Sequence, residues 1–360
     1  MRVLHISLDT AMGGIESFLL NVYNLIDRDK IQFDFIEYGD LTRDFNPKFL
    51  NLGARIYNLP DRKKHPFLAQ KELIELLRNN EYEVVHIHKN SLADIGSIRA
   101  CQKASKSRIV LHSHNSSRDS KTVTLLHKIN RRVLDLNGIT KFSCSIKAAE
   151  WLYGTKEGVT IVKNGIDTNR FAFNSSKRQN IRTELSIDKY FVVGSVGRLT
   201  EQKNPLLMLD VMKKLQDENI CLLWVGDGEL RKAMEIRADE YGMRNRVIFT
   251  GAVPNPEDYY QAMDVFVMPS LYEGFPIAAV EAQCSGLQMI LSSNITKEAD
   301  IIGETKWVSI DSSLNWAQAI ADFKEKKLIR KSNENELKMR GFDMKTTVDY
   351  LQNFYLNGDM

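Results

Sequence analysis

The sequence lacks any apolar run of the roughly 18 to 20 residues that a membrane-spanning helix needs, and it shows no internal repeat or low-complexity tract. Its four cysteines lie far apart without a CxxC pair, which argues against a zinc cluster or a redox pair. No expected strand is followed by GxGxxG and a later acidic residue, the pattern of an NAD-dependent oxidoreductase. Residues 1–7 read as a strand and not as a signal peptide. We therefore expect a cytoplasmic protein with reduced, mostly buried cysteines.

A large net charge is also absent. The formal charge is +3 over 360 residues, which is too small to indicate a nucleic-acid-binding protein. Its distribution is uneven, because nine Lys or Arg side chains between Arg99 and Arg132 stand against one carboxylate, Asp119. This basic patch either meets an anionic membrane surface or the diphosphate of a lipid-linked acceptor, or it is a solvated helix face. The residues expected to contact acceptor or membrane are Arg118, Lys121, Lys128, Arg131 and Arg132.

Length and hydrophobic pattern predict two α/β domains. A chain of 360 residues that is 43% hydrophobic and 26% charged is typical of a globular protein with two cores. Short apolar runs alternate with amphipathic segments, a pattern typical of doubly wound parallel sheets covered by helices. Strands are expected at residues 3–8, 33–38, 84–88, 109–112, 140–145, 191–197, 220–225, 247–250, 265–268, 288–291 and 307–310. We expect two Rossmann-like domains that face each other across a ligand-binding cleft.

The domain boundaries follow from the polar stretch between the two series of strands. Residues 174–188 carry no strong strand signal, so the linker is placed near residues 167–188. The first domain then spans residues 1–170 and the second spans residues 171–341. A helical pattern in the remaining residues, 342–360, predicts a C-terminal helix that crosses back onto the first domain.

Two strand-to-helix turns carry residues suited to an anionic ligand. Gly13 and Gly14 precede an amphipathic segment, where glycine lets backbone N–H groups approach an anion; the alternative is a sterically required turn without a ligand. In the other turn, Arg198 and Lys203 follow an expected strand. An arginine grips two phosphate oxygens at once and a lysine adds a point charge, which suits a diphosphate. The alternative is that both are solvated surface cations.

A third turn, residues 269–282, leads from the strand at residues 265–268 into a helix. Pro276 suits the first helical position, which puts Glu273 in the preceding loop and Glu281 about 7.5 Å past Pro276 along the axis. Glu273 would reach sugar hydroxyls, Glu281 would accept from a ribose diol, and the helix N-terminus would attract the donor phosphates. The alternative, a helix-start carboxylate plus a surface glutamate, fits Glu273 well and Glu281 poorly.

With these turns in place, the sequence resembles family 4 of the glycosyltransferases, a retaining family with the two-domain GT-B fold. The resemblance rests on the glycine pair, on the Arg/Lys pair and on the two glutamates with seven residues between them. It extends over nearly the whole chain and includes residues 163–167 at the domain junction. The segments at residues 111–115 and 144–154 are similar to those of bacterial capsular and exopolysaccharide transferases.

The resemblance implies contacts with a nucleotide-diphospho-sugar, of which a UDP-sugar is favoured. It places Arg198 and Lys203 on the diphosphate, Glu273 on the donor sugar and Glu281 on the ribose. His112 would reach the donor sugar from the first domain, with His114 as the second candidate. Pro276 stands where the family commonly has a glycine, which removes one backbone donor. The remaining donor contacts are expected at Gly13, Gly14, Val253, Gly274, Phe275 and Ile277.

The reaction is expected to need no metal and no other cofactor. His86 and His88 end one strand and His112 and His114 end another, but histidines on one strand face occur without a metal. The cations of the second turn and the helix N-terminus would instead stabilise the departing diphosphate. Without a conventional nucleophile, retention would follow same-face attack, in which the leaving phosphate accepts the acceptor's proton.

By this resemblance a hexose or N-acetylhexosamine passes to a glycan acceptor, such as a polyprenyl-diphosphate-linked one, in bacterial surface polysaccharide synthesis at the inner face of the membrane. Two alternatives remain. A GT-B-fold sugar-nucleotide epimerase would need no acceptor, and the glutamate pair favours a transferase over it. A non-catalytic glycan-binding descendant is disfavoured because all four charged residues of the turns are present.

Overall fold

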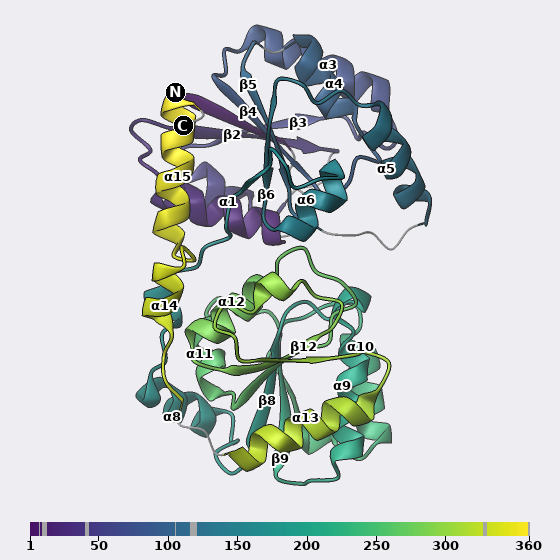
Figure 1. Cartoon of the computed structure of the whole chain (residues 1–360), viewed down its shortest axis with the longest axis vertical. Coiled ribbons are helices and arrows are strands. Elements are labelled where there is room, and N and C mark those ends of the chain that lie inside the picture. The colour runs from purple at the N-terminus through teal and green to yellow at the C-terminus, as the bar shows by residue number, and fades with distance from the viewer. Residues whose placement is uncertain are drawn as a thin grey trace. The chain divides into compact units, whose positions relative to one another are not determined.

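The computed structural model describes residues 1–6, 8, 13–39, 43–104, 106–115, 121–326 and 330–358, and it forms two compact units (Figure 1). The first unit comprises Met1–Gly165 and Met344–Met360, and the second comprises Ile166–Asp343. Each unit has its own parallel sheet with crossover helices. The predicted architecture of two doubly wound, Rossmann-like α/β units is therefore confirmed. The chain passes between the units at Gly165 and Asp343, a few residues from the predicted positions 170 and 341.

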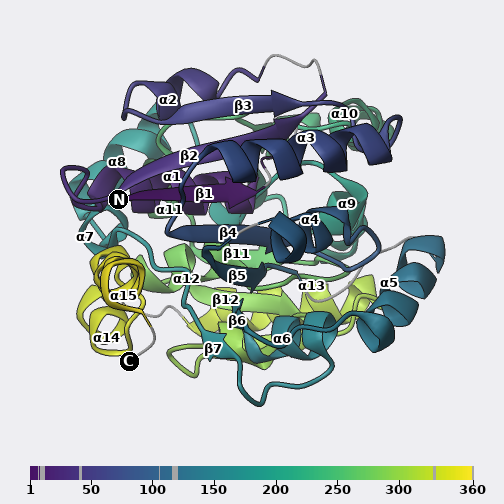
Figure 2. The same ribbon diagram turned by 90° about the horizontal axis from the view of Figure 1, so that it is seen from above.

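The sheet of the first unit has seven parallel strands in the order β3-β2-β1-β4-β5-β6-β7 (Figure 2). Their bounds are β1 Arg2–Ile6, β2 Gln32–Tyr38, β3 Arg55–Leu59, β4 Val84–Lys89, β5 Arg108–Ser113, β6 Ile139–Ser143 and β7 Thr160–Ile161. The sequence pattern predicted five of these and missed the two edge strands. An edge strand needs only one apolar side, and in β3 only Leu59 is buried, so neither edge strand has an apolar run.

Helices cover both faces of the first sheet. One core forms under α1 (Gly14–Leu25), α2 (Asn46–Leu50) and α15 (Met344–Asn357). The other forms under α3 (Pro66–Asn79), α4 (Gly96–Ala104) and α6 (Ile146–Tyr153). Successive strand residues point to opposite faces, so Val84 joins the first core and Val85 joins the second.

The C-terminal helix α15 is a structural part of the first unit, where it packs beside α1 (Figure 1). Five of its side chains are buried in the core that it shares with α1: Met344, Val348, Leu351, Phe354 and Tyr355. The guanidinium of Arg108, at the start of β5, donates to the carbonyl oxygens of Phe354, at 2.8 Å, and of Tyr355. Residues from the first strand and the last helix of the chain therefore lie in the same core.

The second unit has a six-stranded parallel sheet in the order β10-β9-β8-β11-β12-β13. The strands are β8 Phe191–Val196, β9 Ile220–Val225, β10 Val247–Phe249, β11 Val265–Met268, β12 Gln288–Ser292 and β13 Thr305–Val308. One core lies under α7 (Thr168–Phe171), α11 (Pro256–Ala262), α12 (Ile277–Cys284) and α14 (Glu334–Met339). The other lies under α9 (Pro205–Leu215), α10 (Arg231–Glu240) and α13 (Ser313–Lys326).

The linker predicted near residues 167–188 is wrong. These residues contain α7 and α8 (Ser175–Glu184), both within the second unit. Helix α8 is held by charge: Arg178 donates to Asp264 at 2.5 Å, and the buried Arg182 donates to the carbonyl oxygen of Ala262 at 2.8 Å. Apart from Ile181, which packs against the core, the helix docks through arginines, and its weak apolar periodicity is why its sequence resembled a linker.

No helix in the described part of the chain combines the length and the apolar character that crossing a bilayer requires. All four cysteines are buried and unpaired by disulfides, as the sequence indicated. Burial raises the pKa of the Cys101, Cys221 and Cys284 thiols to about 12. Because the thiolate is the reactive form, these thiols are inert packing groups.

Candidate active site

The turn after β8 is shaped by close backbone contacts between glycines. Gly197 has a φ of +152°. A Cβ placed on Gly226 would lie 2.2 Å from the carbonyl oxygen of Gly197. A Cβ on Gly228 would lie 2.5 Å from the carbonyl oxygen of Leu199. Either side chain would force the turn after β8 away from the end of β9. This packing therefore fixes the position from which Arg198 projects.

The two cations of this turn differ in their surroundings. The Nζ of Lys203 lies 2.6 Å from the Oε1 of Glu273, and these side chains are 20% and 9% exposed. Arg198 is exposed, and its side chain has no ion pair or hydrogen bond within the described residues. The expected diphosphate and sugar ligands Lys203 and Glu273 are thus already paired with each other. The uncompensated positive charge at the strand end is that of Arg198.

Backbone hydrogen bonds hold the segment after β11 against the same turn. The amide of Leu271 donates to the carbonyl oxygen of Gln202 at 2.8 Å, and the side chain of Gln202 donates to the carbonyl oxygen of Tyr272 at 3.1 Å. Both segments follow neighbouring parallel strands, β8 and β11, at the carboxyl edge of the sheet. The structure therefore brings Arg198, Lys203 and Glu273 to one place.

Helix α12 begins one residue later than the sequence predicted. Pro276 has a ψ of 97°, so it is the N-cap, and Ile277 is the first helical residue. Two of the predicted donor contacts lie just before this helix. Gly274 is buried, and Phe275 stacks on Phe342 with ring centroids 5.7 Å apart. Val253, on the loop after β10, is half-buried against the same core.

Glu281 lies in the second turn of α12 and is half-buried. Its Oε2 accepts a hydrogen bond from the hydroxyl of Tyr260 at 2.6 Å. Burial raises the pKa of Glu281 to about 7, against the opposing effects of the Tyr260 hydrogen bond and of Arg170. Glu281 is therefore a carboxyl group that changes its charge near neutral pH.

The glycine turn of the first unit lies where β1 leads into α1. The amide of Gly13 donates to the Oε2 of Glu16 at 3.0 Å, so this N–H is not open to a ligand. A Cβ on Gly14 would meet no atom within 4 Å. Packing among the described residues thus does not require a glycine at position 14.

Five histidines gather at the carboxyl ends of β1, β4 and β5. Their ring nitrogens pair directly: His5 Nδ1 lies 3.0 Å from His88 Nε2, His88 Nδ1 lies 2.9 Å from His114 Nε2, and His86 Nε2 lies 3.2 Å from His112 Nδ1. Burial lowers the pKa of His5 and His114 to about 3 and holds the pKa of His86, His88 and His112 well below 6.5. All five rings are therefore neutral at pH 7.

Two groups of three within this histidine cluster have ligand atoms within 4.8 Å of one another: His5 with His86 and His88, and His88 with His112 and His114. That spacing suits a metal ion as well as a hydrogen-bond network. In both groups, two of the nitrogens are already at hydrogen-bonding distance from each other. A metal ion would have to replace these hydrogen bonds.

Four of the nine cations of the basic patch lie on α5 (Lys121–Val133), and Arg118 lies outside the described residues. One side of α5 is anchored to the protein. His127 is buried and accepts from the amide of Leu92 at 2.9 Å, and Arg131 donates to the carbonyl oxygen of Trp151 at 3.1 Å. Arg131 thus has a structural partner, while Lys121, Lys128 and Arg132 are exposed.

The outer side of α5 also carries apolar side chains. Leu125, Ile129 and Val133, at spacings of four residues, are 60%, 48% and 65% exposed, and Leu126 beside them is 45% exposed. The same helix face thus combines an apolar stripe with cations on its flanks. The sequence prediction for this segment rested on its charges alone, although the spacing of four between these apolar residues is also visible in the sequence.

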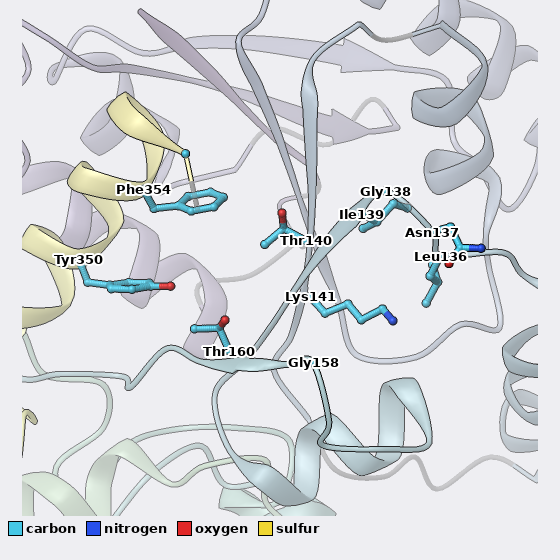
Figure 3. A pocket seen from close by; sticks show the side chains of 11 residues that line it. Leu136, Asn137, Gly138, Ile139, Thr140, Lys141, Gly158, Thr160, Tyr350 and Phe354 are labelled. Carbon is cyan, nitrogen blue, oxygen red and sulfur yellow. The ribbon is translucent and has the colours of Figure 1, made fainter. Parts of the chain in front are cut away.

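A hollow of about 530 Å³ lies elsewhere in the first unit, between β6, β7 and α15 (Figure 3). Asn137, Gly138 and Ile139 line it from the amino end of β6, with Lys141 and Tyr350 nearby. Ligands of open α/β sheets bind at the opposite, carboxyl edge. We therefore do not assign this hollow to the nucleotide or the sugar.

Comparisons with known proteins agree with this arrangement of sheets and turns. The profile described as "Glycosyltransferase Family 4" matches residues 12–170, and the profile "Glycosyl transferases group 1" matches residues 176–339. A Bacillus subtilis (strain 168) protein named as glycosyltransferase EpsF is 30% identical, with 98% of this chain and 96% of that protein covered. An Escherichia coli protein, UDP-Gal:alpha-D-GlcNAc-diphosphoundecaprenol alpha-1,3-galactosyltransferase, is 27% identical over 99% of this chain and 97% of its own. The crystal structure of Anabaena HepE with UDP-glucose superposes with a TM-score of 0.80 at 16% identity, covering 98% of both chains.

Proposed function

Because this chain belongs to glycosyltransferase family 4, we propose that it transfers a hexose or N-acetylhexosamine from a UDP-sugar to a glycan acceptor with retention of configuration. The chain is a hexosyltransferase with two Rossmann-like units of the GT-B fold. The unpaired charge of Arg198 beside the Lys203–Glu273 pair is the observation that carries the donor assignment. An anionic diphosphate at this strand end would neutralise a charge that the protein leaves open.

The donor and acceptor classes are inferred from relatives. The Escherichia coli relative is named for UDP-Gal as donor and for a diphosphoundecaprenol-linked acceptor, and Anabaena HepE was crystallised with UDP-glucose. The capsular polysaccharide protein CapH of Staphylococcus aureus is 26% identical over 99% of both chains. These names support a UDP-sugar donor, a lipid-linked glycan acceptor and a role in bacterial surface polysaccharide synthesis.

The proposed mechanism needs no metal ion. The bond between the anomeric carbon and the leaving phosphate oxygen breaks, the acceptor oxygen bonds to that carbon on the same face, and the leaving phosphate takes the acceptor's proton. Arg198, Lys203 and the N-terminus of α12 stabilise the charge that develops on the diphosphate. Glu273 orients a sugar hydroxyl from its ion pair with Lys203.

Transfer of labelled sugar tests this proposal directly. The protein is incubated with UDP-, GDP- and ADP-sugars and a polyprenyl-diphosphate-linked sugar acceptor, with and without excess chelator. We expect product only from UDP-sugars, with the donor's anomeric configuration and at the same rate in chelator. Loss of activity in chelator and its recovery with magnesium would refute metal independence. Donor conversion without acceptor would favour the epimerase.

We also propose that α5 attaches the enzyme to the anionic membrane surface where such acceptors lie. An amphipathic helix binds a bilayer through buried apolar side chains, and each nearby Lys or Arg adds about 1 kcal/mol on an anionic leaflet. Leu125, Ile129 and Val133 supply the apolar stripe, and Lys121, Lys128 and Arg132 supply the charge. A peripheral position at the inner face of the membrane follows from this proposal.

Replacing Leu125 and Ile129 with serine should weaken vesicle binding at least about tenfold, because two exposed apolar groups no longer enter the bilayer. Flotation with vesicles containing anionic lipid measures this, and folding should be unaffected because both side chains are exposed. The matched control is Ile236→Ser, a 50% exposed isoleucine on α10 of the second unit. Equal binding of wild type and the double variant, or equal binding to neutral and anionic vesicles, contradicts the proposal.

Donor binding should strengthen as Glu281 ionises. With a pKa of about 7, roughly a tenth of the carboxyl groups are ionised at pH 6 and nine tenths at pH 8. Because the carboxylate accepts hydrogen bonds from a ribose diol better than the neutral acid does, the affinity for a UDP-sugar should rise about tenfold over this range. Calorimetry with UDP-glucose suits the test, since its phosphates are both esterified. Glu281→Gln should flatten the profile; an unchanged profile in that variant assigns the titration to another group.

A further inference from the structure

The histidine cluster contains a hydrogen-bond chain that starts on the last helix of the protein. The hydroxyl of Tyr355 lies 2.8 Å from the Nδ1 of His86, and the Nε2 of His86 lies 3.2 Å from the Nδ1 of His112. All three side chains are fully buried. These hydrogen bonds therefore connect α15 to the end of β5, where His112 is located.

The buried surroundings fix the direction of these hydrogen bonds. Within the described residues, the Tyr355 hydroxyl has no hydrogen-bond partner other than His86. A buried O–H that pointed elsewhere would lose its hydrogen bond, so it donates to the Nδ1 of His86. His86 is neutral and must then carry its proton on Nε2, which it donates to the Nδ1 of His112. The proton of the neutral His112 is consequently on its Nε2.

The Nε2 of His112 is buried and has no hydrogen-bond partner among the described residues. An unpaired buried N–H is costly, so a site that keeps one is prepared for an acceptor atom. Phe18 of α1 packs its ring at 86° to the His112 ring, with centroids 5.9 Å apart, and restricts the orientation of the imidazole. The ring is thus held in place with one free donor.

We infer that Tyr355, acting through His86, is a positioning residue that locks His112 as an Nε2–H donor to a hydroxyl oxygen of the sugar substrate. The identity of the acceptor atom rests on the proposed glycosyltransferase function, whereas the protonation pattern does not. The C-terminal helix therefore contributes to substrate binding without contacting the substrate.

Imidazole ¹⁵N spectra of the whole, substrate-free protein test the protonation pattern independently of activity. In the wild type, we expect both His86 and His112 to carry the proton on Nε2. Tyr355→Phe frees the Nδ1 of His86, and both rings should then populate the other tautomer. Tyr23→Phe, which removes a buried hydroxyl bonded to Gln32 on the same unit, is the matched control and should leave the wild-type pattern. Wild-type His112 protonated on Nδ1, spectra unchanged by Tyr355→Phe, or nitrogens coordinated to co-purified zinc would overturn the inference.

Kinetics test the consequence for the sugar. Tyr355→Phe should lower kcat/KM about tenfold, the value of one hydrogen bond, while Tyr23→Phe should stay near the wild type. His112→Gln places an amide N–H near the Nε2 position and should retain more activity than His112→Asn, whose amide lies near Nδ1. An equal loss in both tyrosine variants, or His112→Asn as the better variant, contradicts the inference. If the wild type transfers no sugar from any donor, the proposed function fails while the spectra still decide the protonation pattern.

Discussion

Replacing Arg198 with alanine should reduce kcat/KM for sugar transfer on the order of 100- to 1,000-fold, the usual cost of removing a group that stabilises developing charge. The departing UDP carries more negative charge in the transition state than in the bound donor. Arg198 has no competing carboxylate within the described residues, so its charge is fully available to the diphosphate. Thermal unfolding should be nearly unchanged because the side chain is exposed.

The control for Arg198→Ala is Arg244→Ala, in which an exposed arginine of the same unit with a distant carboxylate at 3.9 Å is removed. Calorimetry with UDP separates binding from catalysis. Lys203→Ala is a less clean probe, because it would leave the buried Glu273 without its ion-pair partner and destabilise the turn itself. Wild-type UDP affinity and kcat/KM in Arg198→Ala would mean that the diphosphate binds elsewhere and would remove the basis of the donor assignment.

The sequence was most informative where one pattern dominates. The buried parallel strands β9 and β11 are apolar throughout, so their observed bounds, Ile220–Val225 and Val265–Met268, match the predicted ones. Helix α8 was missed because Arg178 and Arg182 hold it through Asp264 and backbone carbonyls, and such contacts have no periodic signature. Patterns that reflect the burial of apolar area are readable in advance, whereas docking through specific polar partners is not.

The same distinction applies to the site. The cations and glutamates could be predicted to share one site because their positions relative to strand ends can be read from the chain. The Lys203–Glu273 ion pair could not be foreseen, since it depends on β8 and β11 being neighbours, and strand order is not written in local sequence. Likewise, the histidine cluster needs β1, β4 and β5 side by side and α15 folded back onto them. In the sequence, only two pairs of this cluster could be recognised by their spacing, His86 with His88 and His112 with His114.

Acidification should destabilise the first unit steeply, because its clustered histidines are held in their neutral form, four of them buried and the fifth, His114, half-buried. Their pKa values lie at about 3 or well below 6.5 in the folded protein, whereas an unfolded chain has the ordinary value near 6.5. The unfolded state therefore binds more protons below pH 6.5, so the stability present above that pH is lost as the pH falls toward 3. Each fully buried histidine contributes a slope of about 1.4 kcal/mol per pH unit in this window.

Chemical unfolding between pH 5 and 8, followed by a probe in the first unit, measures this slope. His5→Leu should reduce the slope by the contribution of one histidine, because one titrating ring is removed. The overall stability should also fall, because His88 loses a hydrogen-bond partner. The matched control is His65→Leu, which removes an exposed histidine of the same unit outside the cluster and should leave the slope due to the cluster in place. A free energy of unfolding that is flat between pH 5 and 6.5 would mean that the cluster accepts protons in the folded state. The rings would then be held by something other than neutral N–H···N hydrogen bonds, such as a charge that balances an imidazolium.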